Sequence, residues 1–350
     1  MRVLAVLIVA LAAACTASSP GVTVLTYASP YGPTHPFSRA DQMWMQWIEA
    51  NSGGTLRIRP YWSGSLLSSE HSMAELRHGV ADIGLITPIY ARGGAHLIRA
   101  QAGFYGGLDT FGQQTALYRC LSADDPQFAR ELHGLKILAI QGGNLPGVVT
   151  RDRPVRTLND LAGLRLRAPS ELLAVLEDLG ADPVDMPMGE VYSALAKGVL
   201  DGVVAPADTL RSLHFAEVAR YFNTIAIPRG AYPARAMGER KWRTLTAEQR
   251  ELLEHGTAVW ENALASELTA ANEAGFAAGR EHGVTFYSVS QAEQARFEQI
   301  YARDGEARAR ALARFGIDGL PTFRHARSLA ARLAAGDDIQ CTRDDHEPTA

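Results

Sequence analysis

Arg167 is the side chain of this sequence that is best placed to bind an anion. Alternation from Leu164 to Arg167 predicts a short strand that Pro169 ends, so Arg167 falls at the carboxyl end of that strand. In open α/β sheets the carboxyl ends of the strands border the ligand crevice. A guanidinium at this position can hold a carboxylate through two hydrogen bonds. From the residues alone, a structural salt bridge to a nearby Asp or Glu explains Arg167 at least as well.

Four further side chains are weaker candidates for ligand contacts. Thr87 and Tyr90 flank the end of a strand predicted over residues 83–87, so they point near the same crevice. Asn144 follows another predicted strand where the chain is expected to cross between two halves of the fold, and Tyr232 lies near the return. Residues of these types at strand ends are more often packing or turn residues, and that alternative stays open for each.

The sequence carries none of the familiar catalytic motifs. It has no Gly-x-Ser-x-Gly elbow, no phosphate-binding loop and no Gly-x-Gly-x-x-Gly fingerprint. His71, Glu75 and His78 fall on one predicted helix, but they resemble an ordinary polar stripe rather than a metal site. A net charge of −4 with mixed signs gives no nucleic-acid-binding patch. We therefore expect a protein that is not an enzyme, with no catalytic residue, cofactor, metal or nucleic-acid partner.

The N-terminus has the layout of a secretory signal peptide. Residues 1–14 carry one basic residue and then a short apolar run that ends in small residues. Cys15 after three alanines is typical of a bacterial lipoprotein signal, which would acylate Cys15 and leave residues 15–21 as a tether. Ordinary cleavage near Ala14 or Ala17 is the alternative. Either reading predicts a periplasmic protein, and the first predicts membrane tethering through a lipid.

The cysteine count leaves one possible pair. The chain has three cysteines, so an odd one needs its own explanation. If Cys15 takes lipid, Cys120 and Cys341 remain, and the periplasm permits a disulfide between them. Two unpaired thiols are the other possibility.

The helices and strands predicted around these residues indicate an α/β protein. Strands and helices alternate along the chain, and residues 76–82 are echoed by residues 195–201. Each of these two segments predicts a helix that ends at a glycine, then an Asp and a buried strand. Two matching units suggest two similar lobes with a cleft between them, a favoured place for ligands. Residues 246–281 predict a helix about 50 Å long, longer than one lobe is wide.

Taken in order, several short segments resemble the solute-binding subunit of tripartite ATP-independent periplasmic (TRAP) transporters. No single segment is specific, whereas their order and spacing are. The matching segments span nearly the whole mature chain and are residues 31–36, 52–58, 79–82, 159–169, 179–187, 190–195, 198–202 and 241–245.

This resemblance implies a two-lobed periplasmic binding protein fold with crossover strands and a long helix spanning both lobes. It also implies that the lobes close around one ligand and that Arg167 grips the ligand carboxylate. The expected organisation is residues 22–144 plus 231–268 for lobe I, residues 145–230 plus 269–336 for lobe II, and residues 337–350 for a C-terminal tail.

The sequence departs from relatives of the sialic-acid type in ways that bear on the ligand. Gly147 stands where those relatives place a second arginine, and Val203, Val204 and Ala205 replace a polar pair that many members carry. These changes favour a small or partly apolar monocarboxylate over a heavily hydroxylated sugar acid.

The function that follows is capture of a small organic acid in the periplasm for a TRAP transporter. Its partners would be the ligand and the small and large membrane subunits of that transporter. A periplasmic sensor that reports ligand occupancy to a signalling protein is the alternative, and the sequence does not separate the two.

Overall fold

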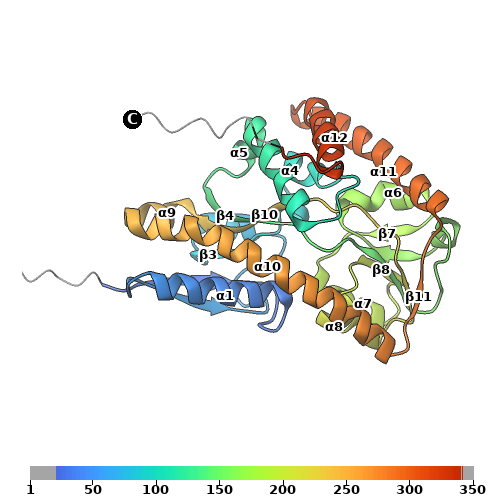
Figure 1. Cartoon of the computed structure of the whole chain (residues 1–350), viewed down its shortest axis with the longest axis horizontal. Helices are drawn as coiled ribbons and strands as arrows, with labels where there is room; N and C mark the ends of the chain where they lie inside the picture. The colour runs from blue at the N-terminus through green and yellow to red at the C-terminus, as the bar shows by residue number, and fades with distance from the viewer. Residues whose placement is uncertain (1–20, 340, 342–350) are drawn as a thin grey trace, which may run out of the picture.

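The structure is a computed structural model that describes residues 21–339 and Cys341. The expected signal peptide, Cys15 and most of the expected tail lie outside the described residues. The described chain forms two β-sheets with helices around them (Figure 1), so the predicted α/β class is confirmed. The first sheet has the strand order β2-β1-β3-β10-β4, and the second has the order β11-β9-β5-β8-β6-β7.

The strands and helices have the following bounds. The first sheet contains β1 (Thr23–Ala28), β2 (Leu56–Tyr61), β3 (Ile83–Leu85), β4 (Leu135–Gln141) and β10 (Tyr232–Gly238). The second sheet contains β5 (Gly147–Thr150), β6 (Arg165–Arg167), β7 (Asp182–Val184), β8 (Gly202–Ala205), β9 (Tyr221–Asn223) and β11 (Thr285–Tyr287). The α-helices are α1 (Pro36–Asn51), α2 (Ser72–His78), α3 (His96–Gln101), α4 (Phe111–Asp124), α5 (Pro126–Glu131), α6 (Leu173–Asp178), α7 (Met188–Ala196), α8 (Thr209–Ser212), α9 (Glu239–Thr244), α10 (Ala247–Glu281), α11 (Gln291–Ala311) and α12 (Leu320–Ala334). The short 3-10 turns are η1 (Pro88–Tyr90), η2 (Leu158–Leu161), η3 (Ser170–Leu172), η4 (Phe215–Glu217) and η5 (Leu312–Phe315).

The chain crosses twice between the two sheets. It leaves the first sheet after β4 and enters the second at β5, which lies antiparallel between β8 and β9. It returns after β9 to β10, which lies antiparallel between β3 and β4. Each sheet therefore contains one strand supplied by a crossing, as expected for a two-lobed binding protein.

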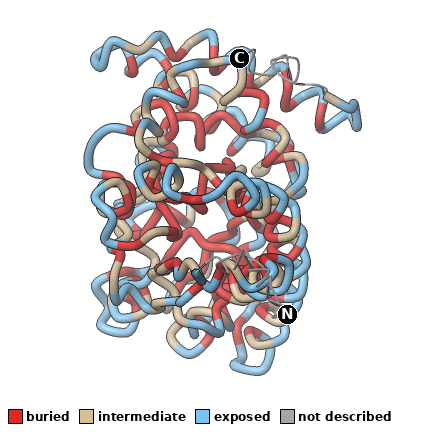
Figure 2. Tube along the Cα trace, turned by 90° about the vertical axis from the view of Figure 1, so that its left-hand side faces the viewer, coloured by how far each residue is buried: buried red, intermediate tan, exposed pale blue. Residues whose placement is uncertain are grey.

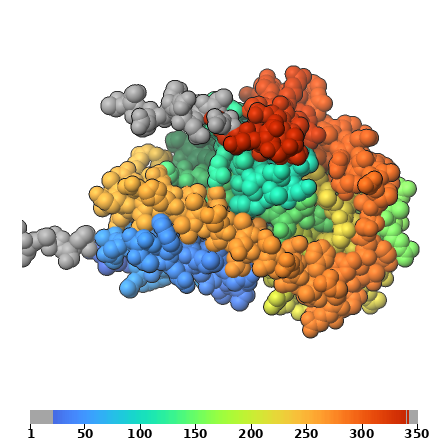
Figure 3. All heavy atoms as spheres, in the orientation of Figure 1, coloured from blue at the N-terminus to red at the C-terminus, as the bar shows by residue number. Residues whose placement is uncertain are grey.

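Helix α10 is the long element that joins both lobes. The Thr246 hydroxyl caps it by accepting a hydrogen bond from the Gln249 N–H, and the Gln249 side-chain oxygen accepts one from the Thr246 N–H. Its 35 residues give a length of about 52 Å at ~1.5 Å per residue. Gly256 allows a close approach to Trp44 of α1, and Gly275 allows one to the Ala207 carbonyl in the second lobe. Figure 3 shows α10 lying across the molecule from one lobe to the other.

The hydrophobic core lies on both faces of each sheet. In the first lobe, one cluster includes Phe104 and Leu117 and the other includes Trp44 and Trp260. The second lobe has a cluster around Leu166 and Tyr301 and another around Val203 and Phe222. Figure 2 shows the buried residues inside the molecule and the exposed ones on its outer turns. Because both faces are covered, the central strands consist almost entirely of buried residues.

The C-terminal helices differ from the expected division. Helix α11 packs on the second lobe through Phe297 and Tyr301. Helix α12 lies within the 269–336 range that we expected in lobe II, yet it packs against α4 of the first lobe. Its apolar face, which includes Phe323 and Leu329, completes the first-lobe core, and this burial decides its place.

The end of the chain is tied to the same lobe. Cys341 follows α12 and is joined to Cys120 of α4 by a disulfide in this structure. Among residues 21–339, no helix is long and apolar enough to cross a membrane.

Candidate ligand-binding site

A pocket lies between the two sheets, above the crossing segments. Elements of both lobes line it, which agrees with the cleft expected from the two-lobed organisation. The lining residues are Tyr31, His35, Phe37, Thr87, Ile89, Tyr90, Ala102, Pro146, Arg167, Pro169, Glu171, Leu172, Met188, Val204, Pro206, Asp208, Thr209, Leu213, Pro228, Arg229, Gly230, Tyr232 and Leu268.

Strand β6 delivers Arg167 to this pocket. The strand pairs in parallel with β7 and β8, and Pro169 follows its carboxyl end, so Arg167 is the last residue of a central strand. The side chain is almost fully buried, with 2% of its surface exposed. Its Nε donates a hydrogen bond to the Met186 carbonyl at 2.9 Å, and its Nη2 donates one to the Tyr90 hydroxyl at 2.6 Å.

The arrangement around Arg167 answers the salt-bridge alternative. Among the described residues, no carboxylate lies within 4.0 Å of its guanidinium, whereas the neighbouring Arg165 is exposed and faces Asp182 at 3.7 Å. A guanidinium has five N–H groups, and Arg167 uses two of them in the bonds to Met186 and Tyr90. Arg167 therefore presents a buried positive charge and unused donors between the lobes.

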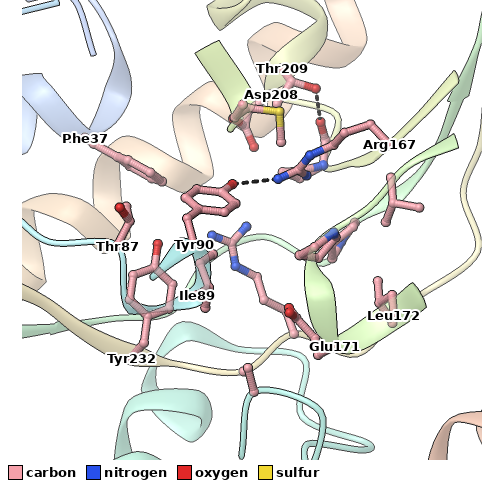
Figure 4. A pocket seen from close by; sticks show the side chains of 18 of the residues that line it. Phe37, Thr87, Ile89, Tyr90, Arg167, Glu171, Leu172, Asp208, Thr209 and Tyr232 are labelled. Carbon is pink, nitrogen blue, oxygen red and sulfur yellow. Dashed lines mark hydrogen bonds between the residues drawn. The ribbon is translucent and has the colours of Figure 1, made fainter. Parts of the chain in front are cut away.

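Three of the four weaker candidates line the same pocket. Tyr90 ends the η1 turn of the first lobe and faces Arg167 of the second, so their hydrogen bond crosses the cleft (Figure 4). Tyr232 opens β10, and its hydroxyl accepts a hydrogen bond from Gln141 Nε2 at 2.9 Å. The Thr87 hydroxyl is already used, because it donates to the Ser69 carbonyl.

Asn144 is the exception among the candidates. It is not part of the pocket lining and instead borders a separate hollow on the other side of the crossing segment. Its Nδ2 donates to Asp208 Oδ1 at 3.2 Å and to the Leu268 carbonyl at 3.0 Å. These bonds tie the crossing segment to the long helix α10, which gives Asn144 a structural task at this position.

Several polar lining residues escaped the sequence interpretation. The most notable are Glu171, Asp208 and Arg229. Asp208 follows Pro206 at the carboxyl end of β8, so the strand-end argument used for Arg167 could have found it. Glu171 in the η3 turn and Arg229 in a crossing segment lack such a signal, because their direction depends on how the turn and the crossing are packed.

Burial shifts the protonation of several of these groups. It raises the pKa of the Glu171 carboxyl and of the Asp208 carboxyl, because a charged carboxylate is poorly solvated inside the protein. Burial also lowers the pKa of the His35 imidazole to about 3, so His35 is neutral at physiological pH. Its Nδ1 accepts a hydrogen bond from the Phe37 N–H at 3.2 Å and thereby caps α1. The imidazole therefore adds no positive charge to the pocket.

Most of the remaining lining is apolar. The other lining side chains are aliphatic, aromatic or proline, and they lie among the charged groups: Phe37, Ile89, Pro146, Leu172, Met188, Val204, Pro206, Leu213 and Leu268. The valine that sequence analysis singled out, Val204, is among them. The pocket thus combines a buried guanidinium with a surface that suits an apolar group.

Comparison with known proteins establishes the family. Residues 27–307 match the family model for bacterial extracellular solute-binding proteins, family 7, and the chain belongs to this family. The resemblance to TRAP transporter solute-binding subunits is thereby confirmed.

The curated relatives match over part of their length. A solute-binding protein of Albidiferax ferrireducens is 28% identical over 182 residues, which is 51% of this chain and 52% of the relative. The 2,3-diketo-L-gulonate-binding periplasmic protein of Escherichia coli is 32% identical over 102 residues, 29% of this chain and 31% of the relative. The chain thus covers about half the length of the first of these relatives, and less of the second.

Solved structures match over nearly their whole length. A TRAP solute-binding protein from Rhodoferax ferrireducens, in complex with copurified benzoate, has a TM-score of 0.81 at 23% identity. The match covers 90% of this chain and 99% of that one. A TRAP solute-binding protein from Bordetella bronchiseptica with bound (R)- and (S)-mandelate has a TM-score of 0.77 at 20% identity, covering 89% and 99%. At these identities the likeness shows the fold, which is the predicted two-lobed binding protein.

Proposed function

We propose that this protein captures a small monocarboxylate between its lobes and delivers it to a TRAP-type transporter. Arg167 holds the carboxylate, with Tyr90, Thr87 and Tyr232 around the ligand. The small and large membrane subunits of the transporter receive the ligand. This role places the protein in the periplasm, either free or tethered through Cys15.

The observation that carries the proposal is the state of the Arg167 guanidinium. It is buried at the end of a central strand, has no carboxylate partner among the described residues and keeps N–H groups free. The carboxyl groups of Glu171 and Asp185 interact with this charge only electrostatically, without a hydrogen bond, and an entering carboxylate would supply a directly bonded partner. A guanidinium and a carboxylate can form two parallel, charge-assisted hydrogen bonds. A ligand with a neutral group or an ammonium group in place of the carboxylate cannot form this pair.

The structural relatives support the same ligand class. Benzoate and mandelate, which are bound in two of them, are both carboxylates with an apolar ring. The apolar lining of this pocket suits such a ring, because each apolar group buried there leaves water at a gain of about 25 cal/mol per Å². A ligand with one carboxylate and a partly apolar body therefore suits both the buried guanidinium and the apolar side chains of the pocket.

A panel of acids and their neutral isosteres tests the proposal. Benzoate, mandelate, 3-hydroxybenzoate and glucuronate are screened by thermal shift and then by calorimetric titration, with benzamide and mandelamide as matched uncharged controls. We expect at least one acid to bind and its amide to bind at least about 30-fold more weakly, because the amide lacks the charge that pairs with Arg167. Equal binding of an acid and its amide, or no binding of any acid, would overturn the proposal.

A further inference from the structure

Besides Arg167, which is proposed to bind the carboxylate, the pocket is lined by a second group of polar side chains. Arg229 comes from the crossing segment before β10, Glu171 from the η3 turn and Tyr232 from the start of β10. All three line the pocket. In Figure 4, Glu171 lies on the other side of Arg167 from Asp208.

Arg229 has donors to spare. Its one hydrogen bond among the described residues runs from Nη1 to the Asn144 carbonyl at 3.5 Å, and no described carboxylate lies within 4.0 Å of it. The guanidinium lies against Gly143, where an added Cβ would come within 2.5 Å of its Cζ. The missing side chain at Gly143 is therefore what leaves room for Arg229. A guanidinium only donates hydrogen bonds, so its unused N–H groups call for an acceptor.

Glu171 has an acceptor to spare. The residue is 9% exposed, and its Oε2 is buried without any hydrogen-bond partner. Arg308 is close, but its Nη2 donates to the Glu171 backbone carbonyl at 2.9 Å. A buried carboxyl oxygen without a partner is uncommon in a folded protein and marks a place where a donor is expected.

Tyr232 lies near both of these groups. The charge of Arg229 lowers the pKa of its hydroxyl and that of Glu171 raises it, against the larger increase that burial causes. The hydroxyl oxygen already accepts from Gln141, so its remaining hydrogen bond is the one it donates. A spare donor, a spare acceptor and a phenol thus line the same pocket.

The charge of the pocket limits what these groups can bind. Arg167 and Arg229 contribute two positive charges, and Glu171 and Asp208 contribute two negative charges when ionised. A single ligand carboxylate already brings the sum to one negative charge, so a second carboxylate would add repulsion inside a poorly solvated site. When both carboxyl groups are ionised, a neutral second ligand group avoids this repulsion. A hydroxyl can accept from Arg229 and donate to Glu171, whereas a keto oxygen can only accept.

We propose that Arg229, Glu171 and Tyr232 form a hydroxyl-binding subsite, and that the natural ligand is a monocarboxylate carrying a hydroxyl group. This inference rests on the proposed function, because Arg167 must first hold the carboxylate. It narrows the substrate class to hydroxylated acids with a partly apolar body.

Matched pairs of acids test the subsite. Calorimetric titration compares mandelate with phenylacetate, and 2-, 3- and 4-hydroxybenzoate with benzoate. We expect the hydroxylated member of at least one pair to bind about 10- to 100-fold more tightly, as hydrogen bonds to charged groups imply. Arg229→Met and Glu171→Met should each bring that ratio close to one, while Arg229→Lys and Glu171→Gln should keep part of it.

Arg165→Met is the matched control, because Arg165 is exposed at the other end of β6 and should leave the ratio unchanged. Thermal unfolding checks that each variant folds, and the Glu171 variants carry the test if Arg229→Met does not. No preference in the wild type, or a preference that survives both methionine variants, would overturn the subsite and leave the carboxylate site standing. Binding of none of these acids would instead remove the proposed function, and the subsite with it.

Discussion

Replacing Arg167 by alanine should weaken acid binding more than any other single change at the pocket. The ligand carboxylate would lose its charged partner, and the Met186 carbonyl and Tyr90 hydroxyl would lose the donor that now serves them. Because Arg167 is 2% exposed, water cannot readily replace these bonds. Removing one partner of such a desolvated pair costs about 2–5 kcal/mol. At ~1.4 kcal/mol per tenfold, the Kd should rise about 30- to 3,000-fold.

Two companion variants separate charge from geometry. Arg167→Lys keeps the charge but not the planar fork, so it should recover only part of the lost affinity. Arg165→Ala removes an exposed arginine that faces Asp182 at 3.7 Å, and its Kd should change by less than about threefold.

The assay is calorimetric titration of all three variants with the acid that binds best, at matched pH and salt. Near-wild-type affinity in a folded Arg167→Ala protein would refute the reasoning and move the carboxylate site elsewhere.

Three further predictions concern stability and anchoring. The unfolded chain protonates His35 below about pH 6.5, whereas the folded chain does so only near 3. As the pH falls between those values, this group should therefore lower the free energy of unfolding by about 1.4 kcal/mol for each pH unit. His35→Asn, which keeps a capping acceptor, should flatten the pH dependence in urea unfolding, and parallel curves would contradict this. Mass mapping without reductant should recover Cys120 linked to Cys341, and replacing both with alanine should cost about 2–5 kcal/mol of unfolding free energy; two alkylatable thiols in the unreduced protein would refute the link. Cys15→Ser should move the protein from membrane to soluble fractions, unless the wild type is already fully soluble, which would end the lipoprotein interpretation.

The elements with strong local signals could be predicted from the sequence. The long helix predicted over residues 246–281 is α10 (Ala247–Glu281), which Thr246 caps. Pro169 and the alternation before it predicted β6 and the position of Arg167 at its end. These features depend on hydrogen bonds and side-chain directions within a few residues, so they are readable without the tertiary fold.

Features that depend on distant packing could not be read in this way. Helix α12 packs against α4 because the first lobe has an apolar surface that matches its own. The sequence of α12 alone does not indicate that α4 is its partner. Asn144 was expected to face the ligand, but its amide bonds to Asp208 and to the Leu268 carbonyl, 64 and 124 residues further along the chain. Arg229 lies against Gly143 of the other crossing segment, a contact between residues 86 positions apart that the local sequence does not indicate.

The hydrogen bond between Tyr90 and Arg167 links the proposed ligand site to lobe closure. It is a direct polar contact between the lobes, at 2.6 Å, and it uses the arginine that the carboxylate is proposed to engage. A single such bond to a charged group contributes about 1.5–3 kcal/mol net, which shifts an open–closed equilibrium by roughly 10- to 150-fold. A shift from mostly open to mostly closed needs a differential of about 5.5 kcal/mol, so Tyr90 alone cannot supply it. The difference must come from contacts that exist only when both lobes surround the ligand, namely the carboxylate on Arg167 and the apolar body against side chains of both lobes. We therefore expect the lobes to close mainly when ligand is bound, because without ligand the Tyr90–Arg167 hydrogen bond supplies less free energy than closure needs.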